Sequence, residues 1–150
     1  MNYAARPVTD AIVANLVAAG LIVGRGEKPV PDVPTSAPIA GWTGVAGQSP
    51  FIGYVVMHPL SGGEVDGTIL EPDTDVSPLF QLSCHGATQD QCQLIADKVH
   101  TVMTTTTFTI PNRSVMRVVV DDLPGARRYD DVQPPEWMSA GRYMLLTTPN

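Results

Sequence analysis

The feature that most constrains this chain is the stretch over residues 78–107, which predicts a strand, a turn and a long helix. Phe80, Leu82 and Cys84 alternate with polar residues, and a period of two is typical of a half-buried strand. Gly86 interrupts the alternation, and apolar residues then recur at helical spacing at Cys92, Ile95, Ala96, Val99 and Met103. A helix that packs back onto its neighbouring strand gives the rest of the chain a core to join.

The start of this helix is marked by Thr88 and Gln91. Their spacing is that of a capping box, in which each side chain bonds to a backbone amide at the other position. Asp90 falls near the positive end of the helix dipole, and Lys98 and His100 lie towards the negative end. The sequence therefore predicts a helix that begins just after Thr88.

A first helix is predicted over residues 7–19, where the apolar residues of one face are Val8, Ile12, Leu16 and Ala19. Gly20 offers a left-handed stop after it. Residues 24–50 differ in composition, with five prolines and five glycines, and so many breakers exclude a long helix or a central strand. We therefore expect an extended loop there. A loop of this length in a compact domain is typically functional or disordered.

Further strands are predicted over residues 51–57, 113–120 and 137–148, where β-branched and other apolar residues cluster. His58 and Pro59 are expected to end the first of them, and the turn residues 61–63 predict a hairpin tip over residues 60–68. In the strand over residues 113–120, Met116, Val118 and Val120 are expected on one face. Residues 121–135 are polar and are expected to form a loop.

The predicted order of elements indicates one α+β domain over residues 1–150, with two helices packed on a mainly antiparallel β-sheet and a long Pro/Gly-rich loop after the first helix. Several strands are apolar on both faces. Two helices can cover only one face of a sheet, so the other face is expected to meet loops or another subunit.

Charged residues make up 16% of the chain, well below the roughly 25% of an ordinary soluble domain, which suggests that part of the surface does not face water. The net charge of −6 argues against a free-standing nucleic-acid binder, because such a protein needs a basic face. An acidic wall would let DNA slide past without binding. No apolar run approaches membrane-spanning length, so we expect no membrane partner and a protein made and used in the cytoplasm or in a particle assembled there.

Candidate reaction centres are weak. Cys84 and His85 are neighbours on a strand and point to opposite faces, so they cannot form a nucleophile–base pair. The acidic run before residue 78 lacks the glycine and glutamate that a calcium loop needs. The three histidines are expected as isolated surface or interface residues. The Asp121/Asp122 pair could bind a divalent ion only if it met Asp130/Asp131, and such doublets are more often solvated or paired with arginine.

Both cysteines, Cys84 and Cys92, are expected as buried thiols, with a disulfide between them as the alternative. Nothing in the sequence assembles a nucleophile, a base and an oxyanion donor. We therefore expect no catalytic residue, no cofactor and no metal site. A small enzyme of unrecognised chemistry remains as an alternative from another class of function.

Four stretches of the chain carry a resemblance to a known family: ARPVTDAIVANLVAAG, SPFIGYVVMHPLSGG, FQLSCHGATQDQCQLIADKV and DDVQPPEWMSAGRYMLLTTP. In this order they resemble tail terminator proteins of long-tailed (siphovirus-type) actinobacterial phages. The resemblance implies a ring, a hexamer, that caps the finished tail tube in the virion, stops the addition of tube subunits and joins the tail to the head-side connector. It also implies that DNA passes through the lumen. Another neck protein, such as a head-closure protein or connector, is the first alternative.

Ring closure needs a head-to-tail interface between unlike patches. The residues that we expect at contacts with neighbouring subunits or the tube are Trp42, Phe51, Leu60, Arg127, Arg128, Asp130, Asp131 and Trp137. Trp42 is the preferred anchor, because a buried tryptophan often contributes a large share of interface energy, although it could equally cover the core of its own domain. Arg127 and Arg128 could pair with Asp130 or Asp131 of a neighbour, or could form a solvated turn.

Overall fold

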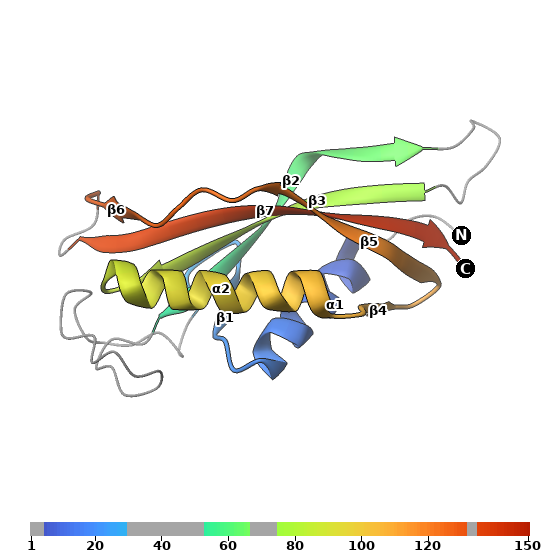
Figure 1. Ribbon diagram of the computed structural model, residues 1–150. Helices are drawn as coiled ribbons and strands as arrows, with labels where there is room; N and C mark the ends of the chain where they lie inside the picture. Colours follow the sequence, from blue (N-terminus) through green and yellow to red (C-terminus); the bar gives the residue numbers. More distant parts are fainter. Residues whose placement is uncertain (1–4, 30–52, 67–74, 132–134) are drawn as a thin grey trace.

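The computed structural model of the chain describes residues 5–29, 53–66, 75–131 and 135–150 (Figure 1). Trp42, Phe51 and most of residues 24–50 lie outside these ranges. Residues 24–29, the start of the predicted loop, are described, and they show that the loop begins later than residue 24. Gly24 and Arg25 belong to a short strand that pairs in parallel with Val56 and Met57.

Within the described ranges the chain forms two helices, α1 (Ala5–Ala18) and α2 (Gln89–Thr105), and one seven-stranded sheet. The sheet order is β1-β2-β3-β7-β5-β4, and β6 pairs with β7. Only the β1–β2 pair is parallel. The strands are β1 (Val23–Arg25), β2 (Tyr54–Asp66), β3 (Asp75–Gly86), β4 (Thr109–Ile110), β5 (Arg113–Asp122), β6 (Arg127–Tyr129) and β7 (Glu136–Pro149). This architecture confirms the predicted α+β fold class.

Both helices lie on one side of the sheet (Figure 1). The apolar stripes predicted for them are buried there, with Val8, Ile12 and Leu16 from α1 and Cys92, Ile95, Val99 and Met103 from α2. They pack on alternate residues of the central strands, such as Leu82 of β3 and Leu145 of β7. Ala19 is exposed, because α1 ends one residue before it and Gly20 turns the chain with a φ of +88°.

The start of α2 confirms the predicted cap and adds one detail. The Thr88 hydroxyl accepts a hydrogen bond from the amide of Gln91 at 3.2 Å. The Gln91 side chain reaches back past Thr88 and accepts from the amide of Ala87 at 2.8 Å. The two side chains thus satisfy backbone amides on both sides of the tight connection from β3, which holds the helix start close to the strand end.

Strand β2 does not end at His58 and Pro59, as predicted, but continues to Asp66. Pro59 pairs with Phe80 of β3. The Val55 amide and the Met57 carbonyl bond towards the β1 side, so the nitrogen of Pro59, two residues further along, faces that same side. Strand β1 has already ended there, and the missing proline amide removes no bond from the β2–β3 ladder.

The predicted hairpin tip over residues 60–68 is also wrong. Leu60 pairs with Leu79 and Glu64 pairs with Ser77, so the backbone of residues 61–63 forms an irregularity inside β2 rather than a turn. A β-bulge is the alternative use of glycine in a strand, because glycine tolerates the extra bend. The β2–β3 hairpin therefore extends further, as Figure 1 shows at the upper right.

Strand β5 contains a bulge that changes the predicted faces. Val115 pairs with Thr147 and Arg117 pairs with Leu146, so Met116 is an extra residue in the ladder with β7. Val115 and Val118 therefore both pack against the core, although strict alternation would place them on opposite faces. Met116 is 59% exposed instead of sharing a face with Val118.

The polar segment over residues 121–135 is not all loop. Strand β5 includes Asp121 and Asp122, and β6 follows after four residues without strand pairing. Arg127 pairs with Met138 and Arg128 with Trp137 across the ladder to β7. The long strand β7 has room for both partners, because β5 pairs with its residues from Arg142 onward and β6 with its first three.

Candidate functional site

Strands β5 and β6 together form one border of the sheet, which we call the outer edge and define as residues 115–129. On their inner side both strands pair with β7. On the outer side, within the described residues, β5 pairs with β4 only at Arg113 and Ser114. A strand with an unpaired side presents a row of backbone amides and carbonyls that another strand can join.

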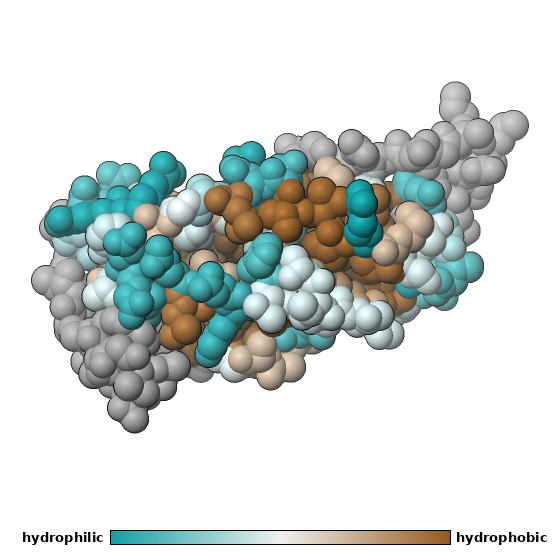
Figure 2. Space-filling view, in the orientation of Figure 1, coloured by the Kyte–Doolittle hydropathy of each residue, from teal (hydrophilic) through white to brown (hydrophobic). Residues whose placement is uncertain are grey.

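The outer edge carries exposed apolar side chains. Met116 is 59% exposed and Leu123 is 50% exposed, and they are two of the three large hydrophobic side chains that the described residues expose, the third being Val17 on α1. Figure 2 shows a run of apolar surface above α2 in the region of β5, whereas the surface towards β6 is mostly hydrophilic. Arg117 is the one charged residue between Val115 and Val120. The rest of the outer edge, residues 121–129, is richer in charge and contains Pro124. The segment over residues 115–120, whose outer side has no partner strand among the described residues, is therefore the part that favours contact with another chain.

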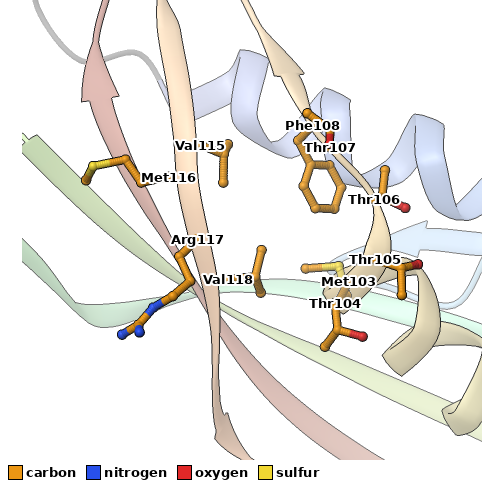
Figure 3. A pocket seen from close by; sticks show the side chains of 10 residues that line it. All are labelled: Met103, Thr104, Thr105, Thr106, Thr107, Phe108, Val115, Met116, Arg117 and Val118. Atoms are coloured by element: carbon orange, nitrogen blue, oxygen red, sulfur yellow. The ribbon is translucent and has the colours of Figure 1, made fainter.

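A hollow of about 310 Å³ lies beside the outer edge, between β5 and the end of α2. Val115 and Val118 point into it towards Phe108 and Met103, whereas Met116 and Arg117 point to the other side of β5 (Figure 3). Its rim is the run of threonines that ends α2, residues 104–107. A strand or side chain from a partner would find an apolar floor and hydroxyl groups at the rim.

The sequence-predicted contact residues at the end of the chain lie next to this edge. Arg127 and Arg128 are in β6, and Trp137 pairs with Arg128 across the ladder to β7. Arg128 forms an ion pair of 2.7 Å with Asp130 of its own chain, in which the side chains are 60% and 68% exposed. The solvated-turn alternative thus describes this pair, and a contact of Arg127 or Asp131 with a neighbour stays a prediction.

Leu60 lies elsewhere, on β2, where it pairs with Leu79 at the start of the extended hairpin. Trp42 and Phe51 are outside the described residues, so their contacts with a neighbour stay predictions. Met116 and Leu123 were missed by the sequence interpretation. The bulge that exposes Met116 follows from pairing with β7 and has no local signal.

A second region lies on the sheet face that carries no helix. There Glu136, at the start of β7, is 6% exposed and accepts hydrogen bonds from two residues far away in the sequence. The Glu136 Oε1 atom lies 2.8 Å from His85 Nδ1 and 3.3 Å from the Tyr54 hydroxyl. The His85 and Tyr54 rings are stacked, with centroids 4.6 Å apart and planes 10° apart. We call Tyr54, His85 and Glu136 the buried polar cluster.

This cluster corrects the expectation of isolated surface histidines, because His85 is only 9% exposed. Sequence reasoning could not find it, since 51 residues separate His85 from Glu136 and 82 separate Tyr54 from Glu136. Burial and the negative charge of Glu136, to which the phenol also donates a hydrogen bond, raise the pKa of Tyr54 above its ordinary range. Burial raises the pKa of Cys92 to about 12, and the charge of Glu136 adds to it.

Both cysteines are buried free thiols, as expected, and no disulfide joins them. The Cys92 thiol donates to the carbonyl of Cys84 at 3.4 Å, which ties the first turn of α2 to β3. Burial, with the neighbouring Cys92 as a second cause, raises the pKa of Cys84. Reactive cysteines have lowered pKa values, so these thiols belong to the core.

Among the described residues, no group of three or more His, Cys, Asp and Glu side chains is placed to hold a metal ion. No helix in the described part of the chain is long and apolar enough to cross a membrane.

No protein-family model matches the sequence, and no curated protein matches it. The fold is similar to that of a protein chain in the solved virion of a native gene transfer agent (GTA) particle. The TM-score is 0.56, the identity is 12%, and the match covers 92% of each chain. At this identity the likeness shows the fold, and it covers nearly the full length of both chains.

Proposed function

We propose that this protein is a structural component of a virion, a tail terminator that forms a ring on the end of the tail tube. The observation that carries the proposal is the outer edge, whose outer side has no partner beyond Arg113 and Ser114 among the described residues and where Met116 and Leu123 are exposed. Isolated proteins normally protect such a border with charges, prolines or covering loops. Residues 115–120 of this border contain one charge and no proline, and such an open segment is expected in a subunit that completes its sheet or its apolar surface only in an assembly.

Three further observations support a virion ring. The fold likeness is to a chain of a virion particle. The two sides of the sheet end differently, at β5–β6 on one side and at β1–β2 on the other. A ring is built from a head-to-tail contact between unlike surfaces, and two different borders can supply it. The resemblance of the sequence to tail terminators favours a position at the end of the tail tube.

In this role the partners are other copies of the chain, in a hexamer, the tail tube protein on one side and the head-side connector on the other. Genomic DNA would pass through the lumen without specific binding, which agrees with a net charge of −6. The ring would occupy the last layer of the tube and so prevent further addition of tube subunits. The chain is proposed to work without a cofactor and without catalysis.

The experiment that tests the proposal is negative-stain electron microscopy of particles assembled with this gene deleted. Tails of abnormal, uncontrolled length that are not attached to heads are the expected result. Tails of normal length beside heads that leak DNA would contradict it and assign the chain to a head-side connector. Intact particles would remove the chain from the neck altogether.

A further inference from the structure

The helix-free face of the sheet holds a cavity of about 430 Å³ whose inner wall is the buried polar cluster. Strands β2, β3 and β7 form its floor, and Tyr129 of β6 and the segment over residues 26–28 form two of its sides. This volume falls in the range of about 300–1,000 Å³ that is usual for ligand pockets. The cavity shares only Tyr129 with the outer edge, and a contact at residues 115–120 would not involve its lining.

The carboxylate of Glu136 is the deepest charge in this cavity. Its side chain is 8% exposed, and both of its hydrogen bonds, from His85 and Tyr54, go to Oε1. Within the described residues, the second oxygen, Oε2, has no hydrogen bond and no ion pair. A buried carboxylate oxygen without a partner is costly, and a cation that reaches it recovers that cost.

The wall beside Glu136 suits a cation as well. Lys28, an exposed residue, places its Nζ atom 5.5 Å from the centroid of the Tyr54 ring, within the range of a cation–π contact. Lys28 forms no ion pair with Glu136 in the structure. The one cation that the described residues place in this cavity thus lies on the aromatic wall and does not reach the carboxylate oxygen.

The aromatic ring beside the carboxylate favours a guanidinium over an ammonium ion, because a guanidinium stacks on such rings. Gln81 and Ser83 line the same cavity, and Gln81 Nε2 donates to Ser83 Oγ at 3.2 Å, which leaves the Gln81 carbonyl oxygen as an acceptor. A guanidinium is planar, carries five donors, stacks on aromatic rings and is weakly hydrated, so it bonds to several acceptors in a partly buried site better than lysine does.

We propose that this cavity receives an arginine side chain from a protein partner, with Glu136 as its anion and Tyr54 as its aromatic wall. A partner chain fits the site, because the cavity opens on the helix-free sheet face and its lining combines the polar groups with half-buried Met138. The inference concerns a cavity that residues 115–120 of the outer edge do not line, and it does not depend on ring formation.

The test is an NMR titration of the full-length protein with N-acetyl-arginine amide, followed at the Tyr54 and His85 ring signals. The matched probe is N-acetyl-citrulline amide, which has a similar shape and no charge. Saturable shifts are expected with arginine, and binding at least about tenfold weaker with citrulline, because a hydrogen bond to a charged group contributes about 1.5–3 kcal/mol. Equal shifts with both probes would overturn the proposal.

Two variants locate the binding. Glu136→Gln keeps an oxygen for His85 and removes the charge, and it is expected to weaken arginine binding at least about tenfold. Glu27→Gln changes an exposed acid at the rim of the same cavity and should leave the affinity within about twofold. Equal arginine binding by Glu136→Gln and by the unsubstituted chain would show that the Glu136 carboxylate is not the group that binds arginine.

A third variant keeps the proposal testable if Glu136→Gln does not fold. Lys28→Ala removes an exposed side chain that competes for the Tyr54 ring, and it is expected to tighten arginine binding by about twofold or more. Unchanged or weaker binding in this variant would show that arginine does not enter the wall that Lys28 covers, which would contradict the proposed geometry.

Discussion

Pro59 lies opposite Phe80 in the ladder between β2 and β3, and its nitrogen faces the side of β2 where β1 has ended. A proline on an unpaired strand side is one of the ways in which proteins discourage unwanted strand pairing. The other border of the sheet differs, because residues 115–120 contain no proline and only Arg117 as a charge. The two borders are therefore unlike, and residues 115–120 of the outer edge are the segment suited to bind a partner strand.

A charge placed on the outer edge is expected to block assembly without unfolding the chain. Met116→Lys adds a cation at an extra, exposed position of the ladder, where a partner would have to desolvate it. We expect at least a tenfold drop in the fraction of tail tubes that the purified protein caps, counted by negative-stain microscopy. The stability to urea should change by no more than about 0.5 kcal/mol.

The matched control for this prediction is Val17→Lys. Val17 is 53% exposed, close to the 59% of Met116, but lies on α1, away from the edge. Its substitution should leave capping unchanged. Equal capping by both variants would contradict the assignment of the outer edge as the subunit interface.

The cap of α2 is expected to contribute measurably to stability. Thr88→Ala removes the hydroxyl that accepts from the Gln91 amide, and we expect a loss of about 1 kcal/mol in the free energy of unfolding. Urea denaturation followed by circular dichroism measures it. Thr101→Ala, at an exposed position of the same helix, is the control and should be neutral or slightly stabilising, because alanine has the higher helix propensity. A loss of equal size in both variants would mean that the capping bond is not its cause.

The close approach of β3 to the start of α2 is expected to exclude any side chain at Gly86. A Cβ atom there would lie 2.7 Å from the amide nitrogen and 3.1 Å from the Cα of Cys92, both in a helix backbone that cannot easily move. Gly86→Ala should therefore destabilise the protein by about 1–3 kcal/mol in thermal or urea unfolding. Gly125→Ala, where a Cβ atom would meet nothing within 4 Å, should have little effect. Tolerance of Gly86→Ala would show that α2 can shift away from β3.

Stability is expected to fall as the pH rises from about 9 to 12. Burial raises the pKa of Cys92 from 9.0 to about 12 and that of Tyr143 from 10.0 to about 12. Between the two pKa values the unfolded chain has lost protons that the folded chain keeps, and this favours unfolding. The stabilisation from each group is therefore complete below its pKa in the unfolded chain, and it is lost as the pH rises towards its pKa in the folded chain. The slope is at most about 1.4 kcal/mol per pH unit for each group.

Urea midpoints at pH 8.0, 9.5 and 10.5, about the range in which Cys92 begins to ionise in the unfolded chain, measure this slope. Cys92→Ala removes one of the buried acids and should reduce the slope, even though the variant is less stable at every pH because it loses core packing. An identical slope in this variant would mean that Cys92 does not keep its proton in the folded state.

The sequence by itself determined the local elements and their buried faces. The apolar spacing of α1 and α2, the Thr88 cap and the alternation of β3 all depend on residues within a few positions of one another, so periodicity predicted them. The fold class followed, because two amphipathic helices and several strands that are apolar on both faces can bury their apolar sides in few ways.

Only the tertiary structure decided the sheet borders and the buried polar cluster. Whether Pro59 ends a strand depends on whether another strand lies beside it, and the exposure of Met116 depends on its register against β7. Glu136, His85 and Tyr54 meet because β2, β3 and β7 are neighbours in the sheet, although they are far apart along the chain. Pairing between distant strands is set by the packing of the whole sheet, and a local pattern does not contain it.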